Sequence, residues 1–129
     1  MCVKGLRVRP ERNIMSEYLL LIYGDESEWI NPTPELGDKM MKGHAEFGER
    51  HGQNIRGGNA LQSTSTATTV RESSPGQFVV TDGAFAETKE ALAGYYLVEA
   101  ANLDEALAMA KEIPVASGGV EVRPIRVFD

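Results

Sequence analysis

The sequence has a single cysteine, Cys2, among its 129 residues. One thiol can form neither an internal disulfide nor a cysteine zinc site, and it fits a reducing cytoplasm. The chain also lacks an apolar run of about 18 residues, the length that a membrane-spanning helix needs. Its 13 Lys and Arg residues are outnumbered by 19 Asp and Glu residues, and a net charge of −6 argues against nucleic-acid binding, which requires a basic face. We expect a cytoplasmic protein whose partners are small molecules or proteins, with no nucleic acid and no membrane.

Hydrophobic residues make up 42% and charged residues 25% of the chain, which is typical of a globular protein with one core. Residues 1–14 differ, because four basic residues and one acidic residue give them a net charge of +3, whereas residues 15–129 hold 9 basic and 18 acidic residues, a net charge of −9. The first segment has no apolar core of the kind that a signal peptide needs. We expect residues 1–14 to be a basic extension, either a mobile arm or the product of a misassigned start upstream of Met15, and residues 15–129 to be a single domain.

The first half of this domain predicts a strand followed by a helix. Residues 18–23 are an unbroken apolar run that ends at Gly24, which indicates a central strand. Thr33 and Pro34 are a capping residue and a first-turn proline, so a helix begins there and ends near Gly52.

The second half predicts a hairpin, a strand, a helix and a last strand. Ser74-Pro75-Gly76 marks the hairpin turn, and residues 94–100 form a strand. Asn102 caps a helix that ends before Pro114, and residues 120–128 form a strand that tolerates Pro124 at an edge or a bulge better than at a central position. This order predicts an α+β, ferredoxin-like antiparallel sheet with two helices on one face.

Three stretches carry a resemblance to a known family: Asp82-Gly83-Ala84-Phe85-Ala86-Glu87-Thr88-Lys89-Glu90, Gly94-Tyr95-Tyr96 and Val120-Glu121-Val122-Arg123-Pro124. Over residues 16–125 the chain resembles the YCII-related superfamily, in the branch named for an Asp-Gly-Pro-Phe run. This resemblance implies a DGPF-type domain with a dimeric α+β barrel fold, a homodimer, and a pocket between helix and sheet.

His44 is a candidate general base, because it lies on the apolar stripe of the first helix, where burial can shift its pKa. The superfamily is proposed to pair a helix histidine at this position with an acid, and the other interpretation is a helix-edge histidine that bonds water or a carbonyl. A metal shared with His51 is not expected, because seven helical residues separate the two backbones by roughly 10 Å, so we predict no metal. No nucleotide-binding or nucleophile-elbow motif is present, and we predict no cofactor.

Asp82 is the second candidate catalytic residue, since it ends an apolar strand before a glycine and can project into a cleft; the alternative is a carboxylate that caps its own turn. Candidate ligand-binding residues are Phe85, Glu87, Lys89 and Arg123. Lys89 can bind an anion or carbonyl, oriented by Glu87, and Arg123 can bind a carboxylate or phosphate in a bidentate manner. Glu87 and Lys89 can instead be solvated surface, and Arg123 can instead pair with Glu121 or contact the second subunit across the dimer interface.

Two functions follow, and the sequence does not decide whether the protein is an enzyme. One is a small-molecule-binding domain that acts as a ligand sensor or as an accessory protein of a sigma factor, because members of the branch that the chain resembles are often encoded beside sigma factors or fused to them. The other, which the resemblance also implies, is a small lyase-like or hydrolase-like enzyme in which Asp82 and His44 exchange a proton while Arg123 or Lys89 stabilises negative charge.

Overall fold

A computed structural model describes residues 15–128, so the expected basic extension lies outside the described residues. The elements follow the chain in the order β1 (Ser16–Gly24), α1 (Ser27–Ile30), α2 (Pro34–His51), β2 (Ile55–Ala60), a 3-10 turn (Thr64–Thr66), β3 (Thr68–Ser74), β4 (Gln77–Asp82), β5 (Ala91–Ala100), α3 (Leu103–Ala110) and β6 (Gly119–Pro124). None of the helices in this part of the chain is long and apolar enough to cross a membrane.

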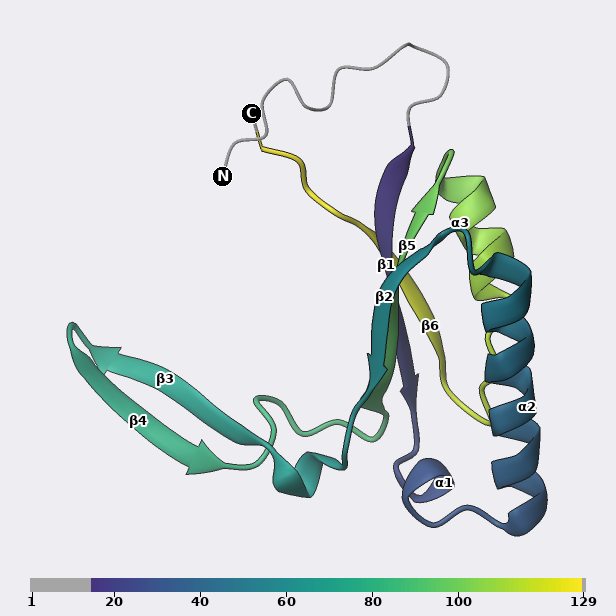
Figure 1. Cartoon of the computed structure of the whole chain (residues 1–129). Helices are drawn as coiled ribbons and strands as arrows, with labels where there is room; N and C mark the ends of the chain where they lie inside the picture. The colour runs from purple at the N-terminus through teal and green to yellow at the C-terminus, as the bar shows by residue number, and fades with distance from the viewer. Residues whose placement is uncertain (1–14, 129) are drawn as a thin grey trace.

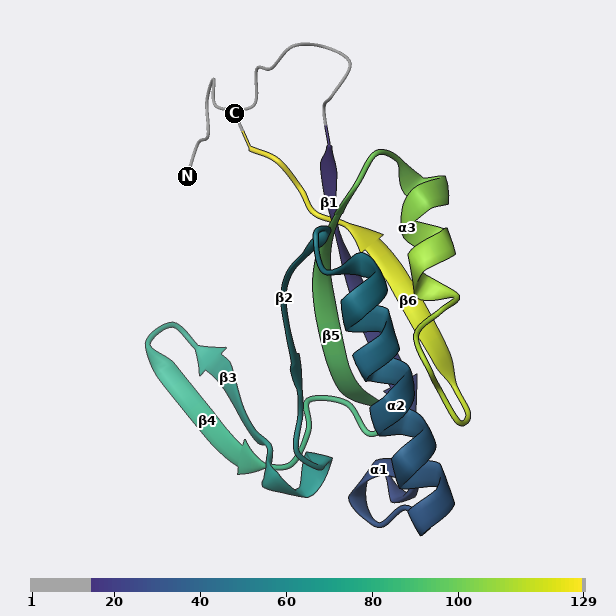
Figure 2. The same cartoon turned by 45° about the vertical axis from the view of Figure 1, so that its right-hand side comes forward.

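Four strands form the main sheet in the order β2-β5-β1-β6, and every neighbouring pair is antiparallel. The helices α2 and α3 cover one face of this sheet (Figures 1 and 2). With the hairpin β3–β4 set aside as an insertion, the chain is a split βαβ repeat, and the ferredoxin-like α+β prediction is confirmed.

The core lies between the sheet and its two helices. Along β1 the alternating residues Tyr18 and Leu20 are buried, and Ile22 packs against the same cluster. Leu19 and Leu21 point to the opposite face and are only half-buried, because no helix of the described chain covers that face (Figure 1). The central position predicted for this strand is confirmed.

Both long helices begin where their capping residues predict. The Thr33 hydroxyl accepts a hydrogen bond from the Leu36 amide at 3.2 Å, with Pro34 in the first turn of α2, and the Asn102 side chain accepts one from the Glu105 amide at 2.9 Å. These bonds satisfy amides that the first turn leaves unpaired. Phe47 anchors α2 in the core with no exposed surface.

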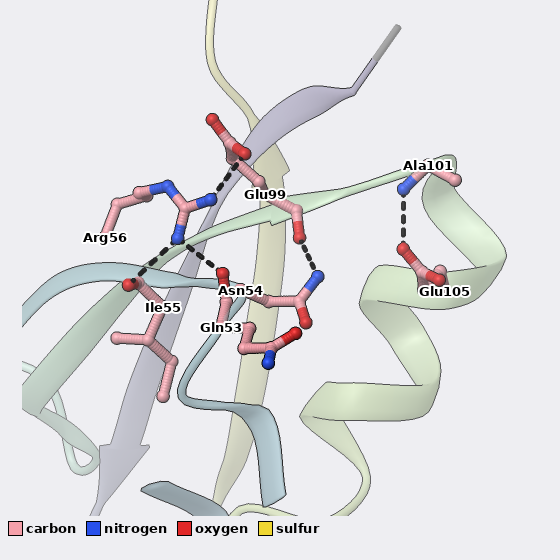
Figure 3. A network of polar contacts seen from close by, with 7 residues as sticks. All are labelled: Gln53, Asn54, Ile55, Arg56, Glu99, Ala101 and Glu105. Carbon is pink, nitrogen blue, oxygen red and sulfur yellow. Dashed lines mark hydrogen bonds and ion pairs between the residues drawn. The ribbon is translucent and has the colours of Figure 1, made fainter. Parts of the chain in front are cut away.

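A polar network ties the start of β2 to the end of β5 (Figure 3). The Asn54 side-chain amide donates to the Glu99 carbonyl oxygen at 2.8 Å, and the Arg56 guanidinium lies 2.8 Å from the Glu99 carboxylate. These contacts fix β2 against β5, although β2 carries two adjacent glycines and has little strand propensity of its own.

The hairpin prediction is confirmed, with Gly76 at a φ of +79° in its turn. The hairpin pairs only with itself and projects from the main sheet on the side away from α2 and α3 (Figures 1 and 2). Val70, Phe78 and Val80 share one of its faces by register and are 59%, 63% and 63% exposed.

Two features differ from the predictions. The short helix α1 was not predicted, and the last strand ends at Pro124 instead of Phe128. Pro124 has no amide to donate to a neighbour, and its partner strand β1 begins only at Ser16, so little strand remains to pair with the following residues. The edge position of Pro124 is as predicted, because β6 is the outer strand.

Candidate functional site

A cavity of about 550 Å³ lies between α2 and the main sheet. Its wall is formed by residues of β1, α1, α2, β2, β5 and the segment before β6, and most of the lining side chains are apolar or aromatic. The glycines keep the strands close at its base; a side chain at Gly94 would bring a Cβ to 2.7 Å from the Asn59 carbonyl oxygen. The cavity therefore depends on close approach of β2 and β5.

His44 and Tyr96 meet across this cavity, one from α2 and the other from β5. The His44 Nδ1 and the Tyr96 hydroxyl oxygen are 2.8 Å apart. The Tyr96 ring packs on Phe47 with ring centroids 4.8 Å apart, and Phe47 is itself completely buried. A rigid core residue thus positions the phenol against the imidazole.

Burial favours the neutral form of both members of this pair. It lowers the pKa of His44 from the ordinary value of 6.5 and raises the pKa of Tyr96 from 10.0. Two hydrogen-bonding arrangements are then available. Either the phenol donates to Nδ1 and Nε2 carries the imidazole proton, or Nδ1–H donates to the phenol oxygen and Nε2 is a free acceptor. The pair can therefore supply a base or a hydrogen-bond donor to a molecule in the cavity.

Other polar side chains also line the cavity. The Glu28 carboxylate accepts a hydrogen bond from the Ser117 hydroxyl at 2.8 Å, and the Asn59 side chain donates to the Tyr95 hydroxyl at 3.0 Å. The Trp29 Nε1 is buried and has no hydrogen-bond partner among the described residues. Such an unpaired donor costs about 1–3 kcal/mol.

Of the six predicted site residues, only His44 lines this cavity. Asp82 ends β4 at the base of the exposed hairpin, where Gly83 makes the expected sharp turn at a φ of +107°. Phe85 lies in the following loop, with the Arg71 guanidinium 4.1 Å from its ring centroid. Glu87 is exposed in the same loop.

The two predicted cationic residues also lie elsewhere. Lys89 lines a separate hollow together with Asp25 and Glu90. Arg123 pairs with Glu121 on β6 at 2.6 Å, one of the alternatives to ligand binding that the sequence offers. Within one chain, then, the structure does not bring His44, Asp82 and Arg123 to a common cavity, and their catalytic and binding roles stay predictions.

Sequence reasoning missed Tyr96, Trp29 and Glu28. The signal for Tyr96 was present, because two consecutive tyrosines on a strand beneath a helix place one ring toward that helix. Trp29 and Glu28 lie on the unpredicted helix α1, and nothing in their spacing indicates a cavity. Among the residues that the structure describes, no group of three or more His, Cys, Asp or Glu side chains could hold a metal ion.

Comparison of the sequence with known proteins identifies a family. Residues 16–129 match the family model of the YCII-related domain. An uncharacterized protein of Rhizobium meliloti (strain 1021) is 36% identical over 116 residues, an alignment that covers 86% of this chain and 93% of that protein.

Proposed function

We propose, from the premise that this chain belongs to the YCII-related domain family, that it binds a small organic molecule in the cavity between α2 and the sheet. The single observation that carries the proposal is the cavity of about 550 Å³, in which the His44–Tyr96 pair and a few other polar groups converge on an otherwise apolar wall. Small-molecule sites are generally concave and apolar with few convergent polar groups. Ligand sensing is the role that this arrangement supports best.

A substitution that fills part of the cavity tests the proposal. Ala60 lines the cavity and is exposed, so Ala60→Phe reduces the free volume with little risk to the fold. Ala86→Phe is the matched control, because Ala86 is exposed on the loop after the hairpin and does not line the cavity.

The measurement is a thermal-shift screen of the full chain against a library of small metabolites. We expect compounds that raise the melting temperature of the wild type and of Ala86→Phe but not of Ala60→Phe. The proposal fails if no compound stabilises the wild type, or if Ala60→Phe responds to every compound as the wild type does.

An acid–base enzyme is the second candidate, and the His44–Tyr96 contact favours it. With Nδ1–H bonded to the phenol oxygen, Nε2 is a neutral base of lowered pKa in a half-buried site. The predicted partner Asp82 lies outside the cavity, so in this second candidate Tyr96 takes the orienting role that was predicted for an acid. Recovery of the bound compound after incubation separates the two functions: a sensor returns it unaltered, and an enzyme returns a changed molecule.

The proposal includes two protein partners, a second copy of the chain and a sigma factor. A second copy of the chain would cover the half-buried leucines of the free sheet face and the apolar face of the hairpin. An isolated two-stranded hairpin is marginal in water, which favours a homodimer. A sigma factor, the other predicted partner, is tested by co-purification of the full chain with the sigma factors of its own host.

A further inference from the structure

Within residues 15–128, the cavity wall carries negative charge and no Lys or Arg side chain to balance it. None of the described residues that line the cavity is Lys or Arg, and Glu28 is its one carboxylate. The cationic residue of the adjoining hollow, Lys89, shares that hollow with Asp25 and Glu90. The described residues of the cavity and the adjoining hollow together hold three carboxylates and one ammonium group, in a chain whose net charge is −6.

Glu28 is held in a fixed position beside an aromatic ring. The Ser117 hydroxyl donates to its Oε1 at 2.8 Å. A Cβ placed on Gly24 would lie 3.9 Å from that same Oε1 and 3.8 Å from Cζ3 of Trp29. The carboxylate and the indole ring thus converge above Gly24, a residue of the cavity lining.

Aromatic rings form much of the remaining wall. Tyr23, Trp29, Tyr95 and Tyr96 all line the cavity. The faces of such rings attract cations, Trp most strongly, and a carboxylate near them adds to that attraction. Thioether side chains from Met40 and Met41 complete the apolar part of the wall.

The three possible ligand charges are not equivalent in this site. An anion would lose its hydration without gaining a cationic partner, and it would approach Glu28. A neutral molecule would cover the carboxylate without compensating its charge. A cation gains both the carboxylate and the ring faces.

We infer that the ligand of this cavity is an organic cation, a protonated amine or quaternary ammonium group attached to an apolar body. The cationic group lies between Glu28 and Trp29, and the apolar body extends toward the His44–Tyr96 pair. The inference rests on the proposed function, because it names the class of molecule that the same cavity binds.

Three matched probes test it on the full chain: 3-phenylpropylamine, 3-phenylpropanol and 3-phenylpropanoate, which differ chiefly in the charge at one end. Isothermal titration calorimetry at pH 7 is expected to give the tightest binding for the amine and the weakest for the carboxylate. Glu28→Gln keeps an acceptor for the Ser117 hydroxyl but removes the charge. It is expected to weaken amine binding roughly twofold to fivefold, the range of a partly exposed charge contact, and to weaken binding of the alcohol less.

Asp104→Asn, at an exposed carboxylate on α3 outside the cavity, is the matched control and is expected to bind the amine as the wild type does. The inference is overturned if the alcohol or the carboxylate binds at least as tightly as the amine, or if Glu28→Gln and Asp104→Asn bind it equally. It is also overturned if none of the three probes binds although a library compound stabilises the wild type and not Ala60→Phe. That result leaves the proposed function standing. The proposed function itself fails only when no compound of any charge depends on the cavity.

Discussion

The Nδ1 atom of His44 and the hydroxyl oxygen of Tyr96 are joined by a 2.8 Å hydrogen bond that crosses from α2 to β5. The two residues are 52 positions apart in the chain, and both line the cavity. This hydrogen bond therefore connects α2 to the main sheet. It also involves the His44 imidazole, a group of the site that can either donate or accept a hydrogen bond.

Tyr96→Phe removes this hydrogen bond but keeps the ring that packs on Phe47. We expect the free energy of unfolding to fall by about 1 kcal/mol, because the partly buried Nδ1 loses its partner. Urea denaturation measures the change. Tyr95→Phe is the control, since its hydroxyl bonds the exposed Asn59, and a loss there as large as that of Tyr96→Phe would contradict the prediction.

His44 makes stability depend on pH in a defined direction. Burial lowers its pKa in the folded protein below the ordinary value of 6.5, so the unfolded chain binds more protons between the two pKa values. The contribution of this group to the free energy of unfolding is therefore fully present above pH 6.5 and is lost as the pH falls through the folded pKa.

Two measurements check this. An NMR titration of the imidazole resonances is expected to give His44 a pKa below 6.5. In His44→Gln, the free energy of unfolding is expected to fall less steeply than in the wild type as the pH drops just below 6.5. His51→Gln, at the other histidine, is the control and is expected to keep the decline that His44 causes. A His44 pKa at or above 6.5 would rule out burial as the dominant influence.

The helices α2 and α3 and the central strand could be predicted because their signals are local. Thr33 and Asn102 cap the helices within three residues of themselves, and the apolar run of β1 needs no partner to be recognised. The cavity could not be predicted in this way. Its lining includes Ile22, Tyr23 and Gly94, which lie at an irregularity in the register between β1 and β5, where Ile22 faces Gly94 and Tyr23 faces Leu92. Such an irregularity belongs to the pairing of two distant strands and has no local signal.

The predicted position of Asp82 shows a second limit. Its sequence context, an apolar strand followed by glycine, was interpreted correctly as a strand end with a sharp turn. That strand, however, belongs to the inserted hairpin and not to the main sheet. Local spacing fixes the hairpin but not the direction in which it leaves the domain, because that direction depends on distant contacts.

Trp29 gives an internal reporter of ligand binding, since it is the only tryptophan of the chain and lines the cavity. We expect its fluorescence to change saturably when 3-phenylpropylamine is added, and to require a higher concentration in Glu28→Gln. Trp29→Phe controls for signals from the tyrosines. An emission spectrum that is unchanged while calorimetry detects binding would place the amine outside this cavity.

The exposed face of the hairpin provides the test of the homodimer. Phe78 is 63% exposed in the single chain, so Phe78→Asp has little effect on a monomer but places a charge inside any interface that covers this face. We expect analytical ultracentrifugation to show a dimeric wild type and a monomeric or weakly associating variant. Thr81→Asp is the matched control, because Thr81 is exposed and points to the opposite face of β4 from Val80. A monomeric wild type would contradict the homodimer. If Phe78→Asp dimerises as the wild type does, the hairpin is excluded from the interface, and the free face of the main sheet is the surface that the second copy covers.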